Sequence, residues 1–166
     1  YTQDETNYMA DILLPEAGDI ESLQLSRIGS TNSGEKSWHH EGWAIRQPAV
    51  EPAGECLDMT IIATRLAEKV GLLEEFNDAI NRGAAGMRLT GEGFDYSLDT
   101  TKAHGCEEIW DAVAKAGSHE LTNGGNVVGI DWFKEHGFML GPLSRLEWYL
   151  QPRLKEKRLR FDVPYQ

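Results

Sequence analysis

The densest group of side chains able to do chemistry lies at positions 38–46, where the sequence reads WHHEGWAIR. Arg46 offers a rigid, two-pronged set of donors that suits a carboxylate, a phosphate or another oxyanion. The two tryptophans of the segment can exclude water from such a contact and so strengthen it. The same pattern fits a packed loop in which Arg46 pairs with Glu41 or Glu51. Pattern alone favours neither interpretation.

His39 and His40 are neighbours in this segment, and their side chains diverge in an extended chain. Glu41 or the distant Cys56 would complete a chemically acceptable zinc set. The chain has neither the HExxH nor the paired CxxC spacing of common zinc sites. We therefore expect no metal ligands here, and we expect a hydrogen-bonded pair of loop histidines.

Cys56 and Cys106 are the two cysteines, and neither belongs to a CxxC pair. We expect two reduced, partly buried thiols. Cys106 follows His104 just before an expected helix, whose dipole can lower the pKa of the thiol. A zinc-deaminase site would need a downstream PCxxC, which the sequence lacks. The glycine-rich stretches 83–86 and 91–93 match no phosphate-binding loop, so we expect turns there.

The overall charge argues against two classes of partner. The 166 residues carry 27 Asp and Glu against 16 Lys and Arg, a net charge of −11, so neither nucleic acid nor an anionic membrane surface is an expected partner. No apolar run approaches the ~20 residues of a membrane span, and direct membrane insertion is not expected. The basic stretch 153–160 is interrupted by acids, which favours a solvated or subunit-docking surface. The compartment, cytoplasmic or periplasmic, stays open.

These residues must be positioned by a mixture of elements. Residues 9–15 form a short apolar run ended by proline, which predicts a buried strand. Residues 20–47 show no sustained periodicity and predict a long ordered loop. Asp58 can cap a helix that ends at Gly71. The apolar face expected for this helix consists of Met59, Ile62, Ala63, Leu66, Ala67 and Val70.

Further helices are predicted downstream. A short one covers residues 73–81 and ends at Gly83, and a turn-rich loop follows over 86–104. The next helix covers 107–115, with Ile109, Trp110 and Val113 inward and Gly117 as its terminator. A turn at 124–126 leads to a helical turn over 131–136 that Gly137 ends, and the tail from Gln151 is expected to be extended.

Three stretches together carry a family resemblance. They are TNYMADILLP at 6–15 with the later Glu21, RQPAVEPAGE at 46–55, and Leu66-Ala67 followed by Gly71. In order and spacing they resemble the molybdopterin oxidoreductases of the dimethyl sulfoxide reductase family. The Arg-Gln-Pro form is similar to the polysulfide and thiosulfate reductase branch. The stretches 108–112 and 131–138 are similar to phenylacetyl-CoA:acceptor oxidoreductases, and both branches stay open.

The resemblance implies an α/β fold: the end of a Rossmann-like domain, with its strand and long loop, followed by several helices and irregular segments. Residues 1–57 would form the end of that domain with an aromatic loop. Residues 58–150 would form a helical segment, and 151–166 an extended basic linker toward a further domain. Family catalytic subunits are several times longer, so the resemblance implies an internal fragment.

The resemblance also implies a cofactor and partners. The full-length enzyme would hold molybdenum bis(molybdopterin guanine dinucleotide), with a [4Fe–4S] cluster outside this segment and neither group bound to the segment alone. Its partners would be the remainder of the catalytic subunit and an iron–sulfur electron-transfer subunit. The activity would be two-electron redox chemistry on a phenylacetyl-CoA-like substrate, a sulfur oxyanion or polysulfide.

Site residues follow from the same resemblance. Glu5 and Thr6 are candidates for hydrogen bonds near the pterins. His39, His40, Trp43 and Arg46 are candidates for lining the substrate funnel, and no residue of this segment is expected to be catalytic. A different class of function also fits the sequence: a non-catalytic, acidic interaction module whose aromatic loop serves as a docking patch.

Overall fold

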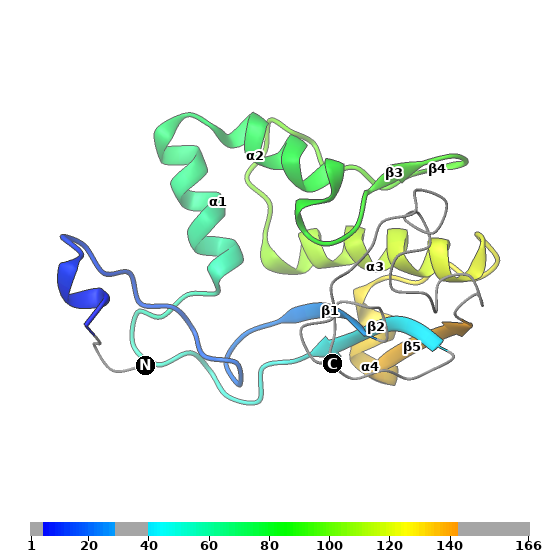
Figure 1. The fold of residues 1–166 in the computed structure, drawn as a ribbon, viewed down its shortest axis with the longest axis horizontal. Helices are drawn as coiled ribbons and strands as arrows, with labels where there is room; N and C mark the ends of the chain where they lie inside the picture. Colours follow the sequence, from blue (N-terminus) through cyan, green and yellow to red (C-terminus); the bar gives the residue numbers. More distant parts are fainter. Residues whose placement is uncertain (1–4, 29–39, 143–166) are drawn as a thin grey trace, which may run out of the picture.

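A computed structural model describes residues 5–28 and 40–142 of the chain (Figure 1). They form a mixed α/β fold, which confirms the predicted class at that level. The larger sheet has the order β1-β2-β5, and a two-stranded hairpin, β3-β4, is separate from it. The predicted tail over 151–166 lies outside the described residues.

The larger sheet is antiparallel throughout. Its strands are β1 (Gln24–Ile28), β2 (His40–Arg46) and β5 (Phe138–Pro142). The long loop predicted over 20–47 is therefore wrong, because two strands of this sheet fall within it. The predicted segments 1–57 and 58–150 share this sheet, since β5 pairs with β2.

The two faces of the sheet differ. Leu25, Trp43 and Met139 are buried on the inner face, where Trp43 lies opposite Met139 in the strand register. Phe138 and Leu140 alternate with Met139 along β5 and are largely exposed. Helix α3 packs against all three strands of the sheet (Figure 1).

Helix α1 (Met59–Val70) has the predicted ends. The Asp58 side chain accepts a hydrogen bond from the Thr60 backbone N–H at 2.8 Å, and Gly71 ends the helix with a φ of 76°. Its predicted apolar face is only partly buried. Ile62 and Ala67 are covered, whereas Met59, Leu66 and Val70 are about half exposed or more.

The next elements follow the prediction closely. Helix α2 (Leu73–Ala79) continues into a π-helical turn, η2 (Ile80–Ala84), where Gly83 breaks the helix at a φ of 116°. The region 86–104 is mostly turns, as predicted, but it includes the short strands β3 (Thr90–Gly91) and β4 (Phe94–Asp95).

Helix α3 (Cys106–Thr122) is longer than predicted, because Gly117 lies inside it and does not end it. Asn123, with φ 50°, is the residue that leaves the helix. Gly117 is needed for close approach: a Cβ at this position would lie 2.5 Å from Trp43 Nε1. The short helix α4 (Ile130–His136) ends at Gly137, as predicted.

The strand predicted over 9–15 is not formed in this structure. A 3-10 helix, η1 (Asn7–Met9), comes first, Ala10 leaves it with extended backbone angles, and Asp11 forms a bend. A single parallel bridge joins Glu16 to Leu57. A strand needs a neighbouring strand that forms backbone hydrogen bonds along its length. Within residues 5–28 and 40–142 this segment has only the Glu16–Leu57 bridge.

Candidate functional site

Arg46 is partly exposed at the end of the sheet, where its side chain has two polar partners. It is the last residue of β2, so the end of the strand holds its backbone. Its Nη1 donates to Asp19 Oδ1 at 2.6 Å, and its Nη2 donates to Ser22 Oγ at 2.8 Å. The predicted pairing with Glu41 or Glu51 is wrong. Glu41 instead accepts a hydrogen bond from Arg27 on the neighbouring strand, at 2.7 Å.

The electrostatics of this group favour exchange of the carboxylate. The Asp19 side chain is 75% exposed and that of Arg46 is 38% exposed, so their ion pair is solvated and contributes little stability. Ser22 is neutral and leaves the charge of the guanidinium otherwise uncompensated. A ligand oxyanion can therefore replace Asp19 on Arg46 without breaking a buried contact.

Hydrogen bonds connect the turn around Asp19 to the loop that follows β2. Glu21 accepts hydrogen bonds from two backbone N–H groups, that of Gly18 at 2.7 Å and that of Ala53 at 3.1 Å. The carbonyl of Ile20 accepts further bonds from the 49–50 backbone. The turn around Asp19 and the loop after β2 are thus tied into one unit that fixes where Asp19, Ser22 and Arg46 meet.

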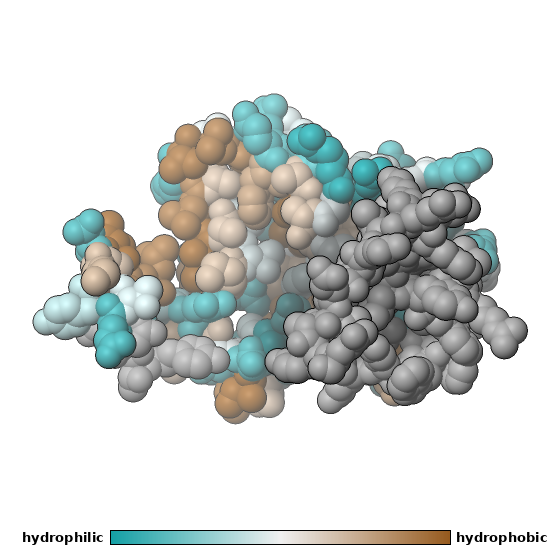
Figure 2. Space-filling view, viewed as in Figure 1, coloured by the Kyte–Doolittle hydropathy of each residue, from teal (hydrophilic) through white to brown (hydrophobic). Residues whose placement is uncertain are grey.

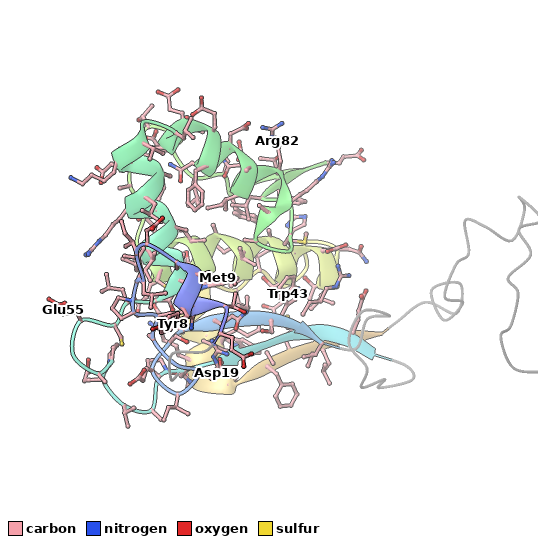
Figure 3. The ribbon with its side chains drawn as sticks, turned by 60° about the vertical axis from the view of Figure 1, so that its left-hand side comes forward. Tyr8, Met9, Asp19, Trp43, Glu55 and Arg82 are labelled. Atoms are coloured by element: carbon pink, nitrogen blue, oxygen red, sulfur yellow. The ribbon has the colours of Figure 1, made fainter. Side chains whose placement is uncertain are left out.

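Trp43 belongs to the core. Its side chain is 2% exposed and packs between the sheet and α3, against Gly117 (Figure 3). A side chain at this depth cannot line a funnel unless the core repacks, so its position does not fit the predicted role. His39 lies outside the described residues. His40 begins β2 and pairs with Pro142 through the backbone, and its side chain is outside what is described.

Glu5 and Thr6 are both exposed and precede η1. Figure 1 places this N-terminal segment at one end of the molecule, away from the sheet that carries Arg46. The structure therefore does not bring the two predicted cofactor residues together with Arg46.

The thiols are free and partly buried, as predicted. The prediction that the helix dipole lowers the pKa of Cys106 is wrong. Burial, followed by the nearby negative charge of Asp58, raises the pKa of this thiol to about 11. Within residues 5–28 and 40–142 no three His, Cys, Asp or Glu side chains lie close enough to hold a metal ion, and no helix is long and apolar enough to cross a membrane.

No local pattern in the sequence indicates the partners of Arg46. Asp19 and Ser22 precede it by more than twenty residues, and no helical or strand spacing relates them. The unpredicted pairing of β1 with β2, together with the hydrogen bonds of Ile20 and Glu21 to the loop after β2, brings them together. Comparisons of the chain with protein-family models, with curated proteins and with solved structures found no match.

Proposed function

We propose that this chain is part of the catalytic subunit of a molybdopterin-dependent oxidoreductase, and that Arg46 binds an anionic substrate there. Of the two substrate classes that the sequence left open, a sulfur oxyanion suits the geometry better. The aromatic class relied on tryptophans, and Trp43 is in the core. Arg46 is instead accessible, with one readily exchanged carboxylate partner.

One observation carries the proposal: motifs that are distant in the sequence meet in space. Glu21 of the first motif region holds the loop of the second through the Ala53 N–H, and the turn beside Glu21 supplies the partner of Arg46. In an unrelated chain, nothing would require these stretches to form one surface. The hydrogen bond between the two motif regions supports a shared functional role for these two stretches.

The finer fold prediction belongs to the same proposal. We infer that the apolar run 9–15 contributes a strand to a Rossmann-like sheet in the complete polypeptide. Ala10 has extended backbone angles, the parallel bridge just after the run, at Glu16, has the orientation of such a sheet, and Ile12, Leu13 and Leu14 are about half exposed or more. These side chains are suited to burial by further strands and helices.

We expect any protein ligand of molybdenum to lie outside this segment. The exposed Glu5 and Thr6 do fit hydrogen bonding to a pterin edge. The bound cofactor would supply two-electron transfer, whereas this chain's part is to hold and orient the anion on Arg46.

The second candidate, a non-catalytic interaction module, rests on a different observation. The interpretation of this region as an aromatic docking loop is less well supported, because Trp43 is buried and much of the predicted loop is a β-hairpin. What favours this candidate is the exposed apolar surface of α1 and the N-terminal segment.

Substitution of Arg46 tests the proposal in the complete polypeptide that contains these residues. Arg46→Ala should lower kcat/KM for thiosulfate or polysulfide reduction by about 10- to 100-fold, since a charge-assisted hydrogen bond contributes about 1.5–3 kcal/mol. Arg27→Ala is the matched control, because Arg27 is also a strand arginine in one exposed ion pair and its side chain is 36% exposed. Unchanged turnover and substrate affinity in Arg46→Ala would remove Arg46 from the site.

A further inference from the structure

An apolar groove runs between helix α1 and the extended N-terminal segment. Its volume is about 180 Å³. One wall comes from α1 through Ile62 and Leu66. The opposite wall comes from Leu14, Pro15 and Leu57, and the carboxylate of Glu55 also lines the groove. Figure 2 shows hydrophobic residues gathered over α1 and over the segment beside it. The groove is large enough for about one large apolar side chain.

Two positively charged side chains lie at the edge of this groove. Arg65 and Lys69 lie one turn apart on α1, and both line it. Most lysines and arginines of the described residues form ion pairs. Within residues 5–28 and 40–142 the exceptions are Arg65, Lys69 and Arg88. The two unpaired cations outnumber the one carboxylate that lines the groove, Glu55, so the rim has a net positive charge that favours a negatively charged occupant.

The apolar surface continues beyond the groove. Met59, Leu66 and Val70 share one face of α1 and are 51%, 49% and 66% exposed. At 1.5 Å per residue the stripe from Met59 to Val70 is about 16 Å long. That length exceeds the reach of a ligand that fills only the groove, and it matches about three turns of a second helix. The shape therefore favours a polypeptide over a small molecule.

We propose that α1 and the groove form a docking site for an acidic amphipathic helix. Its apolar stripe would lie along Met59, Leu66 and Val70, with one large side chain in the groove. Its carboxylates would pair with Arg65 and Lys69. The net charge of −11 opposes an acidic partner at long range, but that field is screened beyond about 8–10 Å, so contacts at the rim decide binding.

This inference does not depend on the oxidoreductase proposal. It needs no particular reaction or cofactor, but it does require Leu14 and Pro15 to stay accessible beside α1 when neighbouring residues join a larger sheet. Failure of the Arg46 experiment would leave it intact, and its own failure would leave Arg46 untouched.

A synthetic peptide provides the test. The probe is a labelled, Ala-rich helical peptide with leucines along one face and glutamates beside them, titrated with the 166-residue chain and followed by fluorescence anisotropy. Binding should be saturable, and the Arg65→Glu/Lys69→Glu double variant should weaken it at least about tenfold. Leu66→Glu should weaken it similarly, and circular dichroism should show each variant folded.

Two matched controls make the result specific. Arg88→Glu reverses the remaining unpaired cation of the described residues, away from the groove, and should leave the affinity unchanged. A peptide with lysines in place of the glutamates should bind the double variant better than the original chain. The proposal is overturned by absence of saturable binding, by an equal loss in Arg88→Glu, or by unchanged affinity in the double variant.

Discussion

Replacing Gly117 by alanine tests how α3 is held against the sheet. The new Cβ would lie 2.5 Å from Trp43 Nε1 and 2.8 Å from Trp43 Cε2. Gly117 and Trp43 are both buried, so the indole has no free space to move into. Such overpacking costs about 1–3 kcal/mol, and a contact this short with a buried ring falls in the upper part of that range, about 2–3 kcal/mol. Alanine returns about 1 kcal/mol of helix propensity, so the net loss in unfolding free energy should be about 1–2 kcal/mol.

Urea denaturation followed by circular dichroism measures this loss, and the Tm should fall by about 2–8 °C for a chain of this length. A double-mutant cycle with Trp43→Phe isolates the contact. In the Trp43→Phe background, where the ring is smaller, the penalty of Gly117→Ala should shrink by more than half. If Gly117→Ala instead raises stability by about 1 kcal/mol, as at an uncrowded helix position, the packing described here is wrong.

Three further predictions follow from individual contacts. The raised pKa of Cys106, about 11, predicts slow alkylation at pH 8 in a Cys56→Ser background. It also predicts an unfolding free energy that falls as pH rises from about 9 toward 11, because the unfolded thiol ionises first; Cys106→Ala should make that fall shallower. The lowered pKa of Asp99, caused mainly by hydrogen bonds from Thr101, predicts stability that is present above the ordinary carboxyl pKa and lost as pH falls through and below it. Acid titration of Asp99→Asn should show a shallower loss, and an unchanged acid profile would contradict the contact. Gly42→Ala should disrupt the β2–β5 pairing, because its Cβ would meet the backbone of β5 at residue 139; a wild-type melting curve for this variant would contradict the register.

Local signals in the sequence were enough to place helix ends. Asp58 and Gly71 bound α1, and Gly137 ends α4, because capping depends on a few neighbouring residues. The same reasoning failed at Gly117. There the glycine serves a contact with Trp43, more than seventy positions earlier, and a rule based on near neighbours cannot detect such a contact.

Periodicity also has a limit, which α1 illustrates. The spacing correctly groups Met59, Leu66 and Val70 on one face, but it does not say whether anything covers that face. In the structure these side chains are substantially exposed. The pattern thus predicted a surface suited to burial, and the three-dimensional arrangement shows that the described residues leave it open.

The candidate site was predictable only in part. Arg46 stood out because its side chain suits an anion, and the structure leaves it accessible. Its partners Asp19 and Ser22 were not predicted, since short strands with weak alternation hid the β1–β2 hairpin that positions them. Trp43 was expected in a loop, but it lies in strand β2, where its side chain alternates into the core.

Molybdenum and pterin analysis of the complete polypeptide tests the proposed function most directly. The proposal predicts stoichiometric molybdenum and pterin in the complete polypeptide, and neither in the 166-residue chain expressed alone. A folded, active complete polypeptide without molybdenum, or stoichiometric molybdenum in the 166-residue chain alone, would contradict it.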